Sequence, residues 1–369
     1  MKRFFFTVIA VAAVASGCTK GGVLESPQTF QDPISFEPYT GKAPVTKATV
    51  ANDATLLEGF RVIGFEETSN GEFDATKPFL RKMVTGVATT TTPEGGEPVT
   101  TTDWSYDGAM FWPGGNVSFV AYGLNVNTTS SATKPTAITT QGADYGDVQT
   151  AGTDIFKMSG TDYTSFTYNV QADRAKQKDL IISPVVSQSS GEVALNLYHV
   201  LSRVGFSIDI QNNAANPPAV AITSIKLTGN FISSATFDLK NAVVSGETVS
   251  YNVRGNRALT TYEFFGEGES FTTYASGKQE IDVTDNDERF LMIVPTGNET
   301  GVGSDAEVVV TYSIGGVPQT PAKLSLASDF KFLAGKAYEF VFTLSTVAVG
   351  FGVEIDDWNA QAEQTHPLK

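Results

Sequence analysis

The stretch VALNLYHVLSRVGFSIDI, residues 193–210, alternates apolar and polar side chains over most of its length. Successive side chains of a β-strand point to opposite faces, so this period places one face on a core and the other towards solvent. A second stretch, GKAYEFVFTL at 335–344, has the same period of two. The apolar positions that set the period are Val193, Leu195, Leu197, Val204, Phe206, Ile208, Ile210, Tyr338, Phe340, Phe342 and Leu344.

Further strands follow outward from these two stretches, separated by Gly, Asn, Asp and Pro. A single helical turn fits residues 198–203, and no long segment has the helical period of 3.6. The pattern therefore predicts an all-β fold of antiparallel sheets, packed as sandwiches. The additional strands are predicted at 60–66, 117–123, 179–183, 222–228, 248–254, 280–284, 289–294 and 307–314.

Two polar segments interrupt the first half of the chain. Residues 85–103 are rich in Thr, Gly and Pro, and residues 125–165 are rich in Thr, Ala and Gly. They predict long surface loops, which are either functional or insertions that the fold tolerates. The 369 residues fit about two domains after a leader, with a boundary near 187–191. We therefore predict an N-terminal β-sandwich domain at 34–190 and a C-terminal one at 191–369.

The overall charge limits the partners of the chain. The formal net charge is −15 and no basic run is present, which disfavours nucleic acid and an anionic membrane surface. Cys18 is the one cysteine, so an intrachain disulfide and a cysteine-based zinc site are excluded. No cofactor is expected.

The N-terminus, MKRFFFTVIAVAAVASGC, has the parts of an export signal. Lys2 and Arg3 precede an apolar run from Phe4 to Val14 that is too short to span a bilayer. Small residues directly before Cys18 resemble a bacterial lipobox. We predict a lipoprotein signal peptide at 1–17 and a lipidated tether at 18–33, with acyl chains such as palmitate on Cys18 anchoring the precursor in the outer membrane.

Several polar and aromatic residues have alternative interpretations. His199 is expected to be structural, and Asp282, Asp285, Asp287 and Glu288 either form a solvated turn or bind Ca²⁺. Asp356 and Asp357 are neighbours on a predicted strand, so they point to opposite faces and cannot act as a catalytic pair. No catalytic constellation supports an enzyme. Trp104, Tyr106, Phe111 and Trp112 fit either a core cluster, which we favour, or a sugar-stacking platform of a surface glycan-binding lipoprotein for nutrient uptake.

Several segments together resemble the fimbrillin superfamily of Bacteroidales, in the order that the family has them. Each motif alone is weak, but their succession behind a lipobox spans nearly the whole chain after the leader. The segments are ISFEPY at 34–39, VTKAT at 45–49, FWPGGNVSFVAYGL at 111–124, KDLIIS at 178–183 with VALNLYHVLSRVGFSIDI at 193–210, FLMIVP at 290–295, GKAYEFVFTL at 335–344 and VEIDDW at 353–358.

The resemblance implies two tandem transthyretin-like β-sandwich domains and assembly into pili that support adhesion to host or bacterial surfaces. In the family a protease cuts after the first strand, which removes the lipid and that strand, and another fimbrillin subunit fills the groove with a donor strand. Here the resemblance places Ile34 and Phe36 on the removed strand and the cut between Lys47 and Ala48. Arginine is commoner than lysine at the cut, which leaves the protease open.

The donor strand and the position of the subunit in the pilus are also open. The eleven residues after Trp358 contain little apolar material, so they make a poor donor strand. Either Phe351, Val353 and Ile355 form the donor strand, or the chain is a tip or accessory subunit. An anchor subunit is a further alternative.

Overall fold

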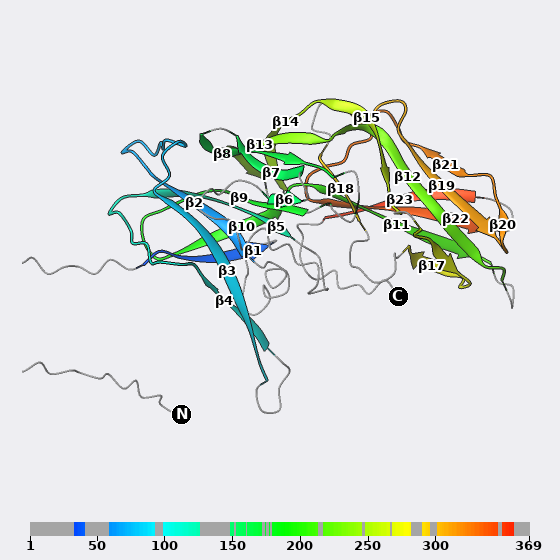
Figure 1. Cartoon of the computed structure of the whole chain (residues 1–369), viewed down its shortest axis with the longest axis horizontal. Helices are drawn as coiled ribbons and strands as arrows, with labels where there is room; N and C mark the ends of the chain where they lie inside the picture. The colour runs from blue at the N-terminus through cyan, green and yellow to red at the C-terminus, as the bar shows by residue number, and fades with distance from the viewer. Residues whose placement is uncertain are drawn as a thin grey trace, which may run out of the picture. The chain divides into compact units, whose positions relative to one another are not determined.

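Alternating β-branched and aromatic residues form 23 strands in the described part of the chain, which confirms the all-β prediction. The computed structural model describes residues 33–40, 59–92, 99–125, 148–150, 153–159, 161–171, 174, 177, 179–212, 217–245, 248–265, 268–281, 290–295, 301–345 and 349–357. No helix in these ranges is long and apolar enough to cross a membrane. Figure 1 shows the strands with their labels.

The first sheet has seven strands in the order β1-β10-β9-β5-β2-β3-β4. Their bounds are β1 Ser35–Thr40, β2 Gly59–Glu66, β3 Leu80–Thr91, β4 Val99–Ser105, β5 Val117–Asn125, β9 Asp179–Gln188 and β10 Glu192–His199. One face of this sheet packs on a second sheet of five strands, where the rings of Tyr122 and Phe166 lie 5.9 Å apart. The second sheet consists of β6 Val148–Thr150, β7 Thr153–Ser159, β8 Asp162–Asn169, β13 Ser234–Ser245 and β14 Thr248–Arg254.

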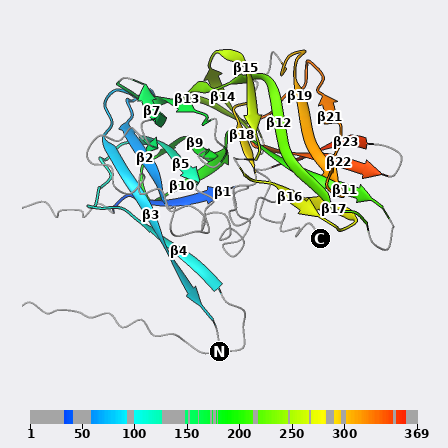
Figure 2. The same ribbon diagram turned by 45° about the vertical axis from the view of Figure 1, so that its right-hand side comes forward.

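Two further sheets form a second sandwich. The third sheet consists of β11 Ser202–Gln211, β17 Gly277–Glu280, β18 Leu291–Ile293, β22 Lys336–Ser345 and β23 Val349–Asp357. The fourth consists of β12 Val220–Ile232, β15 Arg257–Glu263, β16 Phe271–Thr273, β19 Glu307–Ile314, β20 Val317–Pro318 and β21 Ala322–Ser325. The rings of Tyr312 and Phe342 meet between these sheets, with centroids 5.1 Å apart. Figure 2 shows both sheets turned towards the viewer.

The chain crosses between the two sandwiches more than once. β10, β13 and β14 follow residue 190, yet they pair within the first and second sheets. Pairing is antiparallel among the described strands except for two parallel pairs, β1 with β10 and β11 with β22. The domain limits 34–190 and 191–369, and the tandem transthyretin-like arrangement, stay predictions.

Two local predictions are wrong. The helical turn at 198–203 is absent, because β10 continues to His199 and β11 begins at Ser202, with buried Val200 and Leu201 between them. The polar segments are also not only loops. Residues 85–105 contain most of a β3–β4 hairpin, and 148–165 contain β6, β7 and the start of β8, because threonine favours strands even where no apolar alternation marks them.

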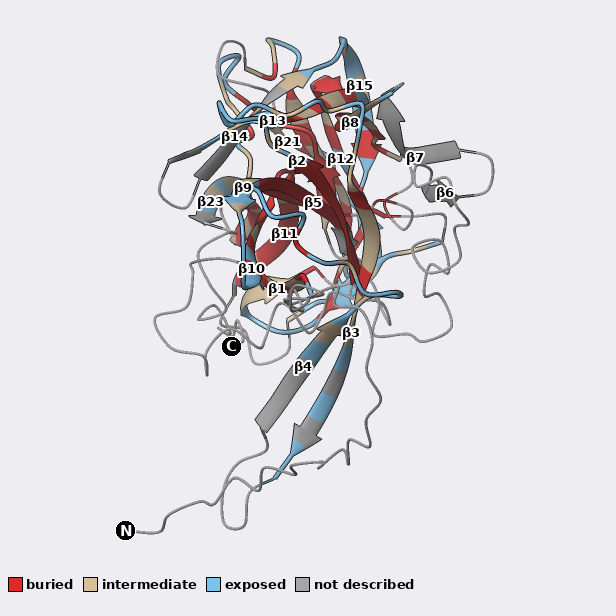
Figure 3. Cartoon of the chain, turned by 90° about the vertical axis from the view of Figure 1, so that its left-hand side faces the viewer, coloured by how far each residue is buried: buried red, intermediate tan, exposed pale blue. Residues whose placement is uncertain are grey.

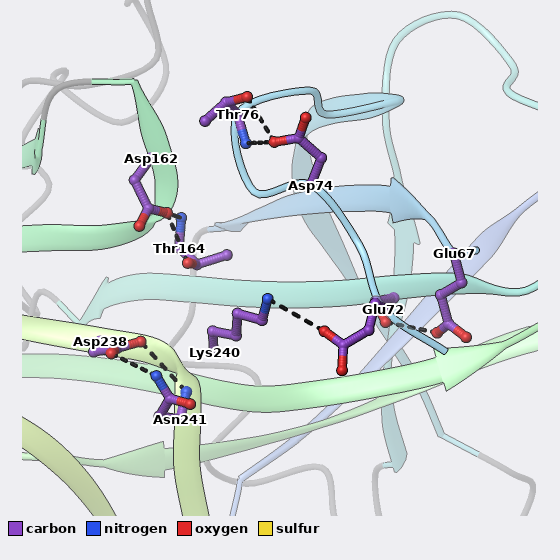
Figure 4. A network of polar contacts seen from close by, with 10 residues as sticks. Glu67, Glu72, Asp74, Thr76, Asp162, Thr164, Asp238, Lys240 and Asn241 are labelled. Carbon is purple, nitrogen blue, oxygen red and sulfur yellow. Dashed lines mark hydrogen bonds and ion pairs between the residues drawn. The ribbon is translucent and has the colours of Figure 1, made fainter. Parts of the chain in front are cut away.

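Short side-chain bonds fix the turns between strands at the edge where the first two sheets meet (Figure 4). Asp74 accepts hydrogen bonds from the Thr76 hydroxyl at 2.6 Å and the Thr76 N–H at 3.0 Å. These bonds, with Lys77, lower the pKa of Asp74 to about 2. Asp162 accepts from Thr164 in the same way, at 2.7 and 2.8 Å. These acidic side chains therefore stabilise the local backbone through hydrogen bonds. Among the described residues, no group of three or more side chains could bind a metal ion.

The hydroxyl of Tyr262 on β15 provides a test of the packed core. Tyr262 is 2% exposed and its hydroxyl has no hydrogen-bond partner among the described residues. A buried polar group without a partner is unfavourable, so Tyr262→Phe should raise the free energy of unfolding by about 1 kcal/mol near pH 7. The matched control is Tyr338→Phe, which removes bonds to the Leu333 N–H at 2.9 Å and the Lys331 carbonyl at 3.0 Å and should destabilise. Urea unfolding of both variants tests this, and an equal loss in the two would contradict it.

The same tyrosine predicts a pH dependence. Burial raises the pKa of Tyr262 to about 12, whereas an unfolded tyrosine ionises near 10. The unfolded state therefore loses its proton first, so the free energy of unfolding should fall by about 2–3 kcal/mol as the pH rises from 10 to 12. Unfolding measured between pH 9 and about 12 should show a smaller decline for Tyr262→Phe than for the parent chain.

Candidate subunit-assembly site

β1 occupies one edge of the first sheet and pairs with the rest of the sheet only through β10. The pairing is parallel and runs from Ser35 opposite Glu192 to Thr40 opposite Leu197. The side chains of Ile34 and Phe36 are each 2% exposed, as expected for apolar residues at alternate positions. β10 contributes buried Val193, Leu195 and Leu197 to the same apolar cluster. Burial of the Ile34 and Phe36 side chains contributes roughly 1.5–3 kcal/mol each.

The ring of Phe36 lies between two aromatic residues from distant parts of the sheet. Its centroid is 5.5 Å from that of Phe119 on β5, edge to face, and 5.7 Å from that of Tyr106, which follows β4. Edge-to-face and tilted arrangements are the favourable ones for aromatic pairs. The ring of Trp112 also packs on Phe119, with centroids 5.8 Å apart. Phe36 therefore completes an aromatic cluster that the body of the sheet provides.

A seam joins β1 to the segment after β4, at the opposite end of the strand order. The Ile34 N–H donates to the Met110 carbonyl at 2.8 Å, and the Tyr106 hydroxyl donates to the Ile34 carbonyl at 2.5 Å. Pro33 forms an isolated antiparallel bridge with Phe111. Burial raises the pKa of Tyr106, partly offset by the Met110 N–H, so its hydroxyl stays a donor at neutral pH. The two edges of the sheet thus approach each other around a buried interior, drawn in red in Figure 3.

The aromatic cluster predicted near residue 110 is mostly part of this core. Trp112 is 4% exposed, Trp104 packs on Phe60 at 5.3 Å, and Tyr106 closes the seam. Only the fourth ring, Phe111, is exposed, at 50%. Sequence reasoning found this cluster but missed the bond of Tyr106 to Ile34, because the partner lies 72 residues away and no local pattern marks it.

Residues 41–58 connect β1 to β2 and contain the predicted cut between Lys47 and Ala48. These two residues, Cys18 and His366 lie outside the described residues, as do the acidic residues between 282 and 288. Arg61, a basic residue further along the chain, lies inside β2 and is 9% exposed. The described part of the chain therefore makes Arg61 a poor protease site.

The predicted donor residues lie on β23, an edge strand of the third sheet. Phe351, Val353 and Ile355 share one face and pair with Phe342, Phe340 and Tyr338 of β22. Phe351 and Val353 are partly buried, and the Phe351 ring lies 5.4 Å from that of Phe342. Ile355 is 55% exposed. The apolar face of β23 is thus only partly buried: Phe351 and Val353 pack against the core, whereas Ile355 is exposed.

His199 is a buried structural residue at the end of β10. Its Nδ1 lies 2.6 Å from Oδ2 of Asp179 on β9, and both side chains are buried. Asp356 and Asp357 are successive residues of β23.

The comparisons identify the class of protein. A model of the fimbrillin-like family matches residues 46–358, so the chain belongs to the fimbrillin-like family. No curated protein matches the chain. A fimbrial protein from Bacteroides vulgatus ATCC 8482 is similar in structure, with a TM-score of 0.54 and 17% identity over 88% of this chain and 99% of that one. A fimbrial assembly protein from Parabacteroides distasonis ATCC 8503 has a TM-score of 0.40 and 13% identity over 88% and 99%. At 17% identity the likeness to the Bacteroides vulgatus protein concerns the fold alone.

Proposed function

We propose that this chain is a non-enzymatic fimbrial subunit that polymerises when a protease removes β1 and a donor strand from another subunit replaces it. The observation that carries the proposal is the placement of β1: an edge strand with two buried apolar side chains, joined to the body by one strand pair and a short seam. Its removal would expose both the backbone edge of β10 and the apolar groove. A new strand restores both, which is β-augmentation.

A cut after Lys47 would release residues 18–47 and with them the lipid on Cys18. The exported precursor would therefore be anchored in the outer membrane, and the cut subunit would be free to enter an extracellular fimbrium. The segment Phe351–Val353–Ile355 has the same spacing as Ile34, Phe36 and Pro38, which supports β23 as the donor. Fimbriae built in this way would support adhesion to host or bacterial surfaces.

The N-terminus of protein sheared from intact cells tests the proposal. Mass spectrometry should find a start at Ala48 in high-mass complexes that resist mild detergent. Lys47→Ala should remove both the new N-terminus and the complexes, whereas the control Lys42→Ala, in the same linker, should leave both unchanged. A lipidated, monomeric chain that starts at Cys18 in all three would overturn the proposal and would favour a glycan-binding lipoprotein.

A further inference from the structure

The two ends of β1 are held differently. At the N-terminal end, Ile34 bonds to the segment after β4 through both of its backbone groups, and Pro33 forms a bridge with Phe111. At the C-terminal end, β1 lies opposite Asn196 and Leu197 of β10, and no other described strand pairs with it there. The seam therefore supports one end of β1 only.

The direction of the backbone groups limits the seam to this end. Successive residues of a strand present their N–H and C=O groups to opposite sides, so Phe36 and Pro38 present theirs on the same side as Ile34. Pro38 has no N–H and cannot donate a bond there. Within the described ranges, the backbone hydrogen bonds on this side of β1 are those of Ile34.

The hydroxyl of Tyr106 is held in place by the segment around it. It accepts a hydrogen bond from the Met110 N–H at 3.4 Å while it donates to the Ile34 carbonyl at 2.5 Å. Lys82 Nζ donates to the Asp107 carbonyl at 2.7 Å and lies 5.8 Å from the centroid of the Tyr106 ring. Because linked hydrogen bonds strengthen one another, Tyr106 binds the Ile34 carbonyl from a fixed position.

The end of β1 that lacks the seam is the end nearest the proposed cut. β1 ends at Thr40, so a cut after Lys47 creates a free chain end shortly beyond it. Chain ends are where a strand loosens first. Separation from β10 therefore begins at Thr40 and proceeds towards buried Phe36 and Ile34, and the bonds of the seam break last.

We propose, on the basis of the proposed donor-strand function, that Tyr106 is a positioning residue that retains β1 on the cut subunit. The cleaved β1 stays bound as a separate peptide and keeps the groove closed until a donor strand displaces it. Displacement begins beside Leu197 and ends at the seam. Release of the seam, and not the cut itself, then sets the rate at which subunits assemble.

Amide hydrogen exchange in the purified, uncut full-length chain tests the unequal ends. We expect the N–H of Ile34 to exchange more slowly than the N–H of Tyr39. Tyr106→Phe, which keeps the ring next to Phe36, should speed exchange at Ile34 roughly fivefold, the effect of losing one hydrogen bond. Exchange at Tyr39 should change little, whereas a general loss of stability would speed both alike.

The matched control is Tyr251→Phe, which also removes a bond from a tyrosine hydroxyl to a strand carbonyl, that of Ile182 at 3.2 Å. It should leave exchange at Ile34 at the parental rate. Exchange at Ile34 that is equally fast in the parent chain and in Tyr106→Phe would overturn the proposal.

Cleavage of the purified chain by a lysine-specific protease tests the retention of β1. Native mass spectrometry should find the fragment that ends at Lys47 still bound to the body of the parent chain. Its release should be roughly fivefold faster from Tyr106→Phe, and high-mass complexes should appear earlier by the same factor. Equal release from the two chains would overturn the role of Tyr106. Faster release from the variant without high-mass complexes in either chain would support that role and reject donor-strand assembly.

Discussion

Phe36→Ala should lower the free energy of unfolding of the uncut chain by about 3–5 kcal/mol, the range for deleting a buried phenylalanine. The ring is 2% exposed and contacts Tyr106 and Phe119, so its loss leaves a cavity inside the curled first sheet. Urea unfolding followed by tryptophan fluorescence measures the change, because Trp112 lies next to Phe119 in the same cluster.

The matched control is Phe111→Ala, at the same seam but half exposed. It should change stability by less than about 1 kcal/mol, because little apolar area returns to water. Equal losses in the two variants would mean that β1 is not packed as described.

Arg174→Met should destabilise the chain by about 3 kcal/mol, the lower end of the range for breaking a buried ion pair. Arg174 is 7% exposed, donates its Nε–H to the Phe264 carbonyl at 2.6 Å, and pairs with Glu269 at 3.1 Å. Its guanidinium also lies 5.1 Å from the centroid of the Phe264 ring. Glu269 is about one-third exposed, which moderates the loss.

Arg174 precedes β9 of the first sheet, whereas Phe264 follows β15 of the fourth, so the residue ties elements of the two sandwiches together. Gln177 does the same by accepting a bond from the Met292 N–H at 2.7 Å. The control Arg254→Met, at an exposed residue of β14, should change the urea midpoint little. An Arg174→Met chain with the parental midpoint would show that this contact adds nothing to the fold.

Alternation of side chains was enough to predict the strands with one buried face. In β11 and β22 every second residue is apolar and buried, as at Val204 and Phe206 and at Phe340 and Phe342. This period of two arises because one face of each strand packs on the core. The sequence predicts a loop where the β3–β4 hairpin lies, because its run of threonines shows no alternation of apolar and polar residues. The parallel pairing of β1 with β10 has no local signal at all, since it joins residues that are distant in sequence.

In the candidate site, too, some residues can be predicted from the sequence and others cannot. Ile34 and Phe36 were predicted from their alternation and their resemblance to a family segment, and the structure places both in one buried cluster with β10. The seam that holds β1, formed by Tyr106, Met110 and Phe111, could not be predicted, because it depends on how the sheet curls. Cys18 and the Lys47–Ala48 cut stay predictions.

The parallel pairing of β1 has a consequence for the order of folding. β1 and β10 are separated by most of the first half of the chain, and bringing such distant segments together is entropically slow. The antiparallel strands β9, β5, β2, β3 and β4 can form ladders without β1. We therefore expect β1 to dock last, with φ-values near zero at Ile34 and Phe36. If β1 docks last, its removal should leave the antiparallel strands of the first sheet folded.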